Sequence, residues 1–149
     1  MLEMVMNAER LKCIAENDGQ LWLQTVGSLK EMIEKGKIYI SGPITNIENW
    51  QKNFIAAEEA LCSWAKAIAV VNPYRIAMRL EKEYRKNERF PDYTDYMRED
   101  IKALSECDAI CLLPGWKRSK GARMEYRIAK ILCMDIFYYT ADGKITGKE

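Results

Sequence analysis

The chain has 149 residues, of which 48% are hydrophobic and 30% are charged, and its formal net charge is +1. This length and composition are typical of one soluble globular domain with a proper core. Because the charges nearly balance, nothing in the composition favours a nucleic-acid polymer or an anionic membrane as a partner. No apolar run is long enough to cross a bilayer, and the first residues lack the layout of a signal peptide.

The chain contains no histidine and five cysteines. Without histidine, Ser-His-Asp triads and histidine-based acid–base catalysis are excluded. The cysteines form no CxxC pair and have no histidine to complete a zinc site. Buried free thiols in a reducing cytoplasm are the interpretation that the burial habit of cysteine favours. If the protein is an enzyme, carboxylates, tyrosines and backbone amides must carry its chemistry.

Residues 1–36 are predicted to form a helical N-terminal extension. Residues 7–17 and 21–35 have apolar helical faces, and Asn17-Asp18-Gly19 separates them. We expect this extension to pack on the domain or on a second subunit, and it shows no residues suited to chemistry.

The domain proper is predicted to span residues 37–149 and to alternate strands with helices. Short β-branched, aromatic or apolar segments predict strands at residues 37–41, 67–71, 108–114 and 134–139. Residues 144–146 are either a short edge strand or a frayed tail. Apolar residues at helical spacing predict helices at residues 49–65 and 93–105 and from residue 121 onward, where Met124, Ile128, Ile131 and Leu132 form a stripe.

Alternation of strands and helices with short connections predicts a parallel sheet with helices on both faces. We therefore expect an α/β fold, a flavodoxin- or Rossmann-like three-layer sandwich with a parallel sheet of four or five strands. The charged segment 74–92 is interpreted as a solvated helix with paired charges, or alternatively as a mobile cap over a site.

Small and turn-forming residues follow three of the strands. Ser41-Gly42-Pro43, Asn72-Pro73 and the segment 114–121 each end a predicted strand. Right-handed crossovers bring these strand ends to one edge of a parallel sheet, where open α/β sheets bind ligands. The sequence therefore predicts the pocket at this edge, and a glycine at position 42 would let a ligand approach the backbone closely. The full dinucleotide glycine pattern is absent, so a NAD site is not expected.

Two carboxylates are candidates for chemistry in this pocket. Asp100 lies on the helix before the central strand, and Glu125 follows the loop after it, within about the first turn of the next helix. Glycosyl transfer commonly uses such a pair, one group attacking the anomeric carbon and the other protonating the leaving group. Ser119 and the amides near Gly121 would form a small anion cradle. From spacing alone, Glu125 could equally be a surface charge stabilised by the helix dipole.

Several motifs resemble the nucleoside 2-deoxyribosyltransferase superfamily. They are Tyr39-Ile-Ser-Gly-Pro-Ile44, Asp100 followed eight positions later by Asp108, and the segment from Gly115 to Glu125 with Ser119 and Gly121. The resemblance covers about residues 37–140. Within the superfamily it is closest to the 2'-deoxynucleoside 5'-phosphate N-hydrolase branch and to small, often phage-borne domains of unassigned function.

This resemblance implies that Glu125 is the nucleophile of a double displacement and that Asp100 positions the sugar or assists the leaving base. Gly115, Ser119 and Gly121, with Gly42, Pro43 and Ile44, would hold the 5' end of a 2'-deoxynucleoside 5'-monophosphate or a deoxynucleoside. Tyr39 either contacts substrate or points into the core. Asp108 either contacts substrate or caps and orients its neighbours. No metal or organic cofactor is implied.

The chain departs from the superfamily at its end. The transferases usually receive a substrate-contacting asparagine near the C-terminus from a neighbouring subunit, and residues 140–149 contain none. This favours hydrolysis over base exchange. The resemblance also implies a homodimer or a higher homo-oligomer with composite sites.

Two other functions fit the sequence. A non-catalytic nucleotide-binding or sensing module would use the same cradle without cleavage, and a structural role would use the N-terminal extension, with Trp22, as the partner surface.

Overall fold

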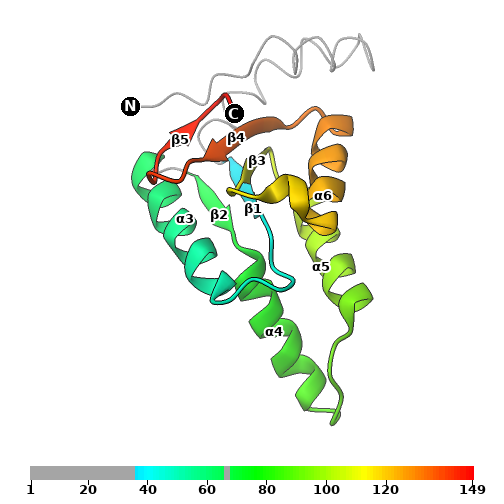
Figure 1. Ribbon diagram of the computed structural model, residues 1–149. Coiled ribbons are helices and arrows are strands. Elements are labelled where there is room, and N and C mark those ends of the chain that lie inside the picture. The colour runs from blue at the N-terminus through cyan, green and yellow to red at the C-terminus, as the bar shows by residue number, and fades with distance from the viewer. Residues whose placement is uncertain (1–35, 66–67) are drawn as a thin grey trace, which may run out of the picture.

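A computed structural model describes residues 36–65 and 68–149 of the chain (Figure 1). The helices expected within residues 1–35 lie outside the described residues. The expectation that this extension, with Trp22, forms a partner surface therefore remains a prediction.

Five strands form one sheet in the order β2-β1-β3-β4-β5. The strands are β1 (Lys37–Ser41), β2 (Ala69–Val71), β3 (Ala109–Leu112), β4 (Asp135–Tyr139) and β5 (Ile145–Thr146). β1 to β4 are mutually parallel, and β5 pairs antiparallel with β4. The parallel sheet is therefore confirmed, and the short C-terminal segment is an edge strand rather than a frayed tail. Since β2 and β3 lie on opposite sides of β1, the strand order reverses there, which creates a switch point between β1 and β3.

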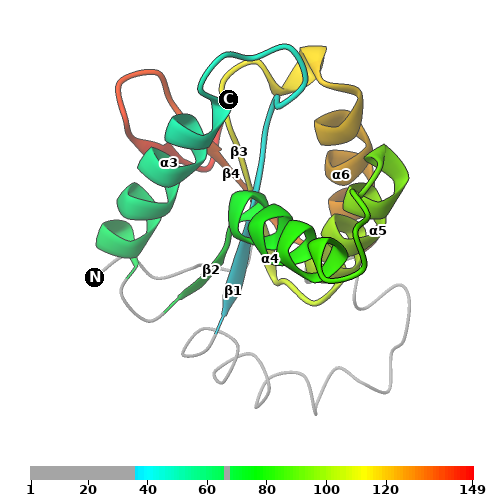
Figure 2. The ribbon, with the colours of Figure 1, turned by 90° about the horizontal axis from the view of Figure 1, so that it is seen from below.

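Four α-helices and one 3₁₀ turn cover the sheet within the described residues. They are α3 (Trp50–Trp64), α4 (Pro73–Arg85), α5 (Tyr93–Ser105), the 3₁₀ turn η1 (Trp116–Arg118) and α6 (Lys120–Ile131). Seen from below, α3 lies on one face of the sheet and α5 and α6 lie on the other (Figure 2). The mixed α/β sandwich of Rossmann or flavodoxin type is thus confirmed.

Strand β1 divides its side chains between two cores because successive residues of a strand point to opposite faces. Ile38 and Ile40 pack with Phe54 and Leu61 of α3. Tyr39 packs on the opposite face, in the core that includes Leu104 of α5. Both faces are covered, which explains why β3 is wholly apolar and why β1 is buried from Ile38 to Ser41.

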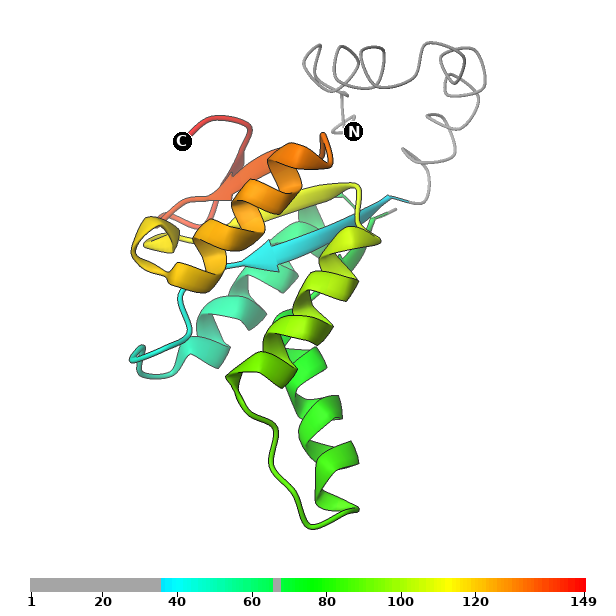
Figure 3. The same cartoon turned by 90° about the vertical axis from the view of Figure 1, so that its right-hand side faces the viewer.

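Helices α4 and α5 form an antiparallel pair that extends beyond the sheet (Figure 3). Asn72 caps α4 by accepting a hydrogen bond from the Tyr74 amide at 3.0 Å, and Pro73 occupies the first turn. Asp92 and Asp95 form a reciprocal capping box at the start of α5. The charged segment is therefore a helix, as the first of the two interpretations predicted.

The expected apolar stripe of α6 is wrong in part. Ile131 is 75% exposed and Leu132 is 47% exposed, whereas Ala122, Glu125 and Ala129 are buried. α6 begins at Lys120 and ends at Ile131, so its last large apolar residues lie beyond the part that packs on the sheet. The two alanines allow a close approach, and the buried face carries a glutamate between them.

Among the described helices none is both long and apolar enough to cross a membrane. Cys107 and Cys111 are buried free thiols, as expected, but the free thiol of Cys62 is exposed. Cys133 is disulfide-bonded, which contradicts the expectation of a free thiol there.

Candidate active site

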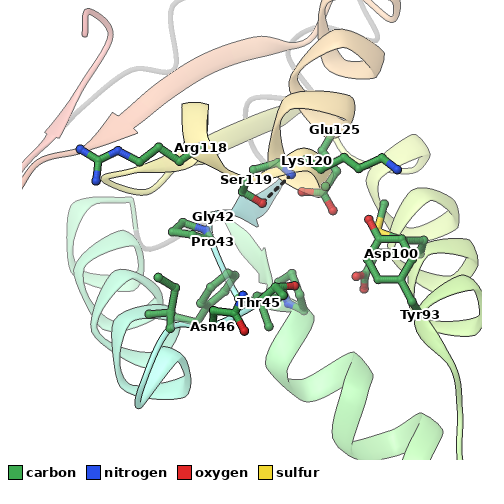
Figure 4. Close-up of a pocket in the computed structure, with 17 residues that line it drawn as sticks. Gly42, Pro43, Thr45, Asn46, Tyr93, Asp100, Arg118, Ser119, Lys120 and Glu125 are labelled. Carbon is green, nitrogen blue, oxygen red and sulfur yellow. Dashed lines mark hydrogen bonds between the residues drawn. The ribbon is translucent and has the colours of Figure 1, made fainter.

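A cavity of about 490 Å³ lies where the chain leaves the C-terminal ends of β1 and β3 (Figure 4). This is the edge at which the sequence predicted a pocket. Its walls come mainly from the β1–α3 loop (residues 42–47), from Tyr93, Met97 and Asp100 of α5, and from residues 118–122 with Glu125. In the described chain α4 contributes only Pro73, so its charged residues do not cover the site.

Glu125 lies in the second turn of α6, one turn further along than expected, and only 6% of its surface is exposed. The Tyr39 hydroxyl donates to Oε1 at 2.8 Å, and the Ser41 hydroxyl donates to Oε2. Because these two residues alternate with Ile40 on β1, they point to the same face of the sheet. The carboxylate is therefore held at both oxygens where it lines the cavity. Of the two interpretations of Glu125, the surface charge is excluded.

The environment of Glu125 pulls its pKa in two directions. Burial raises the pKa of Glu125 to about 7, although the hydrogen bonds from Ser41 and Tyr39 lower it. Burial and the charge of Glu125 raise the pKa of Tyr39 well above its usual value, so the phenol remains protonated and able to donate. Glu125 is thus ionised in a substantial fraction of molecules at neutral pH.

Asp100 is the second carboxyl group of the cavity and is also buried. Burial first, and then the charges of Glu125 and Glu99, raise the pKa of Asp100 to about 8. Two neighbouring carboxyl groups do not both ionise readily in a site of low polarity. Asp100 has the higher pKa of the two and is therefore the group that keeps its proton when Glu125 ionises, which is the division between an acid and a nucleophile that glycosyl transfer uses.

The N-terminus of α6 forms another wall of the cavity. The Ser119 hydroxyl caps the helix by accepting from the Ala122 amide at 3.2 Å. The first amides of a helix have no partner within it, which leaves those of Lys120 and Gly121 available to an anion. In Figure 4 the side chain of Lys120 extends towards α5, whereas that of Arg118 extends away from the two carboxyl groups.

Gly42 and Gly121 both line the cavity, but they differ in how much space surrounds them. A Cβ on Gly42 would lie 2.8 Å from Cβ of Leu113, so position 42 is small because the chain packs closely there. This packing accounts for the glycine, and Gly42 also lines the cavity, so the close approach of a ligand to its backbone stays a prediction. The nearest atoms to a Cβ on Gly121 would belong to Met97, Tyr93 and Ser119, at 3.6 to 3.9 Å, which is ordinary van der Waals contact. Position 121 has room for a methyl group, and that room is part of the cavity.

Most of the predicted site residues come together in this cavity: Gly42, Pro43, Ile44, Asp100, Ser119, Gly121 and Glu125. Tyr39 lies beneath it, fully buried, and touches Glu125. Tyr39 therefore supports the site and does not form its surface.

Two predicted site residues lie elsewhere. Asp108 precedes β3 at the opposite end of the sheet, where its Oδ2 accepts the Lys37 amide at 2.9 Å. This contact supports the second role expected for Asp108, which was to cap or orient its neighbours. Its position excludes contact with a ligand in the cavity. Gly115 lines a separate cavity of about 220 Å³, and its φ of 85° suits a turn into η1.

Sequence reasoning missed several contributors. Ser41 was recognised only as the end of a strand, although its alternation with Tyr39 is visible in the sequence. Tyr93 and Met97 belong to the helical spacing that predicts α5 and were given no role in the site, yet both line the cavity and Tyr93 is 53% exposed. No sequence pattern indicated that Lys120 would line the cavity, because its position there depends on where α6 begins. Over the part of the chain that the structure describes, no group of acidic, cysteine or histidine side chains is arranged to hold a metal ion.

Comparison with protein families shows that the chain belongs to the family described as "Domain of unknown function (DUF4406)", whose model matches residues 36–138. The matched range includes both carboxyl groups of the cavity and both hydroxyls that hold Glu125. A comparison with curated proteins finds no match.

Proposed function

We propose that this protein cleaves the N-glycosidic bond of 2'-deoxynucleoside 5'-monophosphates by double displacement through Glu125. The observation that carries the proposal is a buried carboxylate, held at both oxygens, that faces a cavity beside a second carboxyl group of higher pKa. The resemblance of the strand, loop and helix motifs to the deoxyribosyltransferase superfamily supports it independently.

In the first step an oxygen of Glu125 attacks C1' of the deoxyribose. The C1'–N bond breaks, and its electron pair leaves with the base. Asp100 gives its proton to a ring nitrogen of that base, which leaves as a neutral molecule. The product is a deoxyribosyl ester of Glu125 and an ionised Asp100.

In the second step a water molecule attacks C1' and its proton passes to Asp100. The ester bond breaks, the electron pair returns to Glu125, and deoxyribose 5-phosphate is released. A second base in place of water would give a transferase. We propose water as the acceptor.

The N-terminus of α6 supports a 5'-phosphate as the anionic part of the substrate. The free amides of Lys120 and Gly121 and the hydrogen of the Ser119 hydroxyl can donate to phosphate oxygens, and the helix dipole favours their charge. The basic side chains of Arg118 and Lys120 add positive charge at the same wall. We further propose that the protein acts as a homodimer or a higher homo-oligomer.

The first experiment measures free base chromatographically after incubation with each of the four deoxynucleoside 5'-monophosphates. We expect release by the wild-type protein and none by Glu125→Gln, which keeps the shape of the side chain but cannot form the ester. Release by Glu125→Gln at the wild-type rate would refute the mechanism. If no monophosphate is cleaved, the deoxynucleosides are assayed with an acceptor base.

The role of Asp100 is tested with a substrate whose base needs no proton. The base of 7-methyl-2'-deoxyguanosine 5'-monophosphate is already cationic and leaves as a neutral molecule. Asp100→Asn should therefore be impaired about 10² to 10⁴-fold on the ordinary substrate, the usual contribution of general acid catalysis, and much less on the methylated one. Equal impairment on both would assign Asp100 to sugar binding.

A nucleotide-binding module without catalysis is the alternative that the same α6 N-terminus supports. Saturable binding of deoxynucleotides by calorimetry, with no base released from nucleotides or nucleosides over long incubation, would select it.

A further inference from the structure

Two hydroxyl groups from one strand hold the carboxylate of Glu125, and they differ in what the surrounding structure requires of them. Tyr39 fills a large volume in the core beneath the cavity, so its ring is needed whatever its hydroxyl does. Ser41 contributes little volume and is 0% exposed. A buried hydroxyl without a partner is costly, and alanine would occupy the same space without that need. The Ser41 hydroxyl is therefore explained by its hydrogen bond to Glu125 and not by packing.

One hydrogen bond would leave the carboxylate free to turn about its last side-chain bond. Tyr39 holds Oε1 and Ser41 holds Oε2, so together they fix the plane of the group. Both donors are anchored in β1, which is paired with β2 on one side and β3 on the other. The orientation of Glu125 is thus set by a strand that is paired on both sides, as a preorganised nucleophile requires.

We propose that Ser41 is a positioning residue that fixes the orientation of the Glu125 carboxylate and holds it in the ionised form. This inference rests on the proposed function insofar as Glu125 is the nucleophile. Ser41 is 0% exposed and does not line the cavity, whereas Glu125 does, so we expect Ser41 not to touch substrate. Its effect passes through Glu125 alone.

The titratable and charged groups around Glu125 come from each element packed near it. Tyr39 donates from β1, Asp100 faces the cavity from α5, and Arg118 and Lys120 line it from η1 and the start of α6. The hydrogen bonds that oppose burial and lower the pKa of Glu125 come from Ser41 and Tyr39. Removing the Ser41 hydroxyl therefore raises the pKa of Glu125, by about one pH unit if the lost bond has the usual strength of one to a charged group.

The test is a pH titration of the side-chain carboxyl groups by ¹³C NMR in the absence of substrate. Glu125→Gln identifies the Glu125 resonance by its disappearance. We expect the pKa of Glu125 to rise by about one in Ser41→Ala and by less in Ser41→Cys, since the thiol is a weaker donor of similar size. An unchanged pKa in Ser41→Ala would overturn the proposal.

Cys111→Ala is the matched control. Cys111 is as deeply buried in the adjacent strand but belongs to the core on the α3 face. Its truncation perturbs the sheet without touching Glu125, and the Glu125 titration should remain that of the wild type. If Ser41→Ala does not fold, Ser41→Cys decides the question, because a pKa equal to that of the wild type there overturns the proposal.

This titration separates the inference from the proposed function. A protein that releases no base but shows the shift supports the role of Ser41 in setting the ionisation of Glu125 and refutes the glycosidase. A protein that releases base without the shift refutes the role of Ser41 and retains the glycosidase. Where base is released, the acid limb of kcat/KM should move upward in Ser41→Ala by the same amount as the NMR pKa, with a larger fall in kcat than change in KM.

Discussion

The two faces of β1 carry out different tasks with alternate residues of one short strand. Ile38 and Ile40 point to the α3 face and join a core of hydrophobic side chains. Tyr39 and Ser41 point to the α6 face and hold Glu125. The α3 face gains stability from apolar burial. On the α6 face, burial of two carboxyl groups lowers the stability gained from apolar burial, and it raises their pKa values to about 7 and about 8.

This difference shows that burial alone does not distinguish a structural core from a site. Leu61 on α3 and Glu125 on α6 are both buried, yet one lies among apolar neighbours and the other needs two hydroxyl donors. The energetic cost of the second arrangement is evidence for a function that requires it. Substitutions on the α6 face should therefore mainly affect activity, and substitutions on the α3 face should mainly affect stability.

The largest expected effect is on turnover. Glu125→Gln should lower kcat by about a thousandfold or more, because the variant cannot form the covalent bond of the proposed intermediate. Leu61→Ala, on the other face, should leave kcat per folded molecule within about twofold of the wild type. Initial rates normalised to the folded fraction make this comparison. A loss of turnover in folded Leu61→Ala similar to that of Glu125→Gln would end the distinction between the faces.

The next largest expected effect is on stability, and here the α3 face is the sensitive one. Leu61→Ala should lower the free energy of unfolding by about 2–5 kcal/mol, since it leaves a cavity in a well-packed core. Urea denaturation monitored by tryptophan fluorescence measures it. Glu59→Ala is the control, because Glu59 is exposed on the same helix and its truncation should change stability by about 0.5 kcal/mol or less. Equal effects of the two substitutions would contradict the assignment of this core.

Glu125→Gln itself should stabilise the protein at alkaline pH. The pKa of Glu125 rises from its ordinary 4.5 to about 7 on folding, so the folded state binds the proton more tightly than the unfolded state. Wild-type stability therefore falls as the pH rises between those values, and the whole cost is present above about 7. Glutamine has no charge to bury, and the variant should gain about 1–3 kcal/mol over the wild type between pH 4.5 and pH 8.

Urea denaturation at the two pH values measures this gain, with Glu59→Gln as the exposed counterpart that should show none. If the difference in stability between the wild type and Glu125→Gln is the same at pH 4.5 and pH 8, the ionised carboxylate is not costly in the fold.

The smallest expected effect is the shape of the pH profile. The proposed mechanism needs an ionised Glu125 and a protonated Asp100, so kcat/KM should be highest between about pH 7 and about pH 8. It should fall about tenfold per pH unit on either side of that window. The two apparent values belong to the coupled pair. Asp100→Asn should lose the alkaline limb and keep the acid limb, and an alkaline limb that persists in this variant would assign it to another group.

The amino-acid sequence by itself determined the order of the elements and the parallel sheet. Hydrophobic period, turn residues and caps are local properties, and they placed helices α3 and α5 and strands β1 and β4 within one or two residues. The topology then followed from the right-handed crossover, which put the pocket at the correct edge and brought Asp100 and Glu125 into it.

Only the tertiary structure decided which residues near this edge of the sheet form the candidate site. The burial of Glu125 depends on how closely Ala122 and Ala129 bring α6 to the sheet, and Ile131 and Leu132 are exposed because the helix extends past that contact. The placement of Asp108 at the far end of β3 and the clash that makes position 42 a glycine likewise involve residues distant in the sequence. Such distances are set by packing between elements, and local pattern carries no information about them. The sequence therefore determined which residues could act, and packing decided which of them face one another.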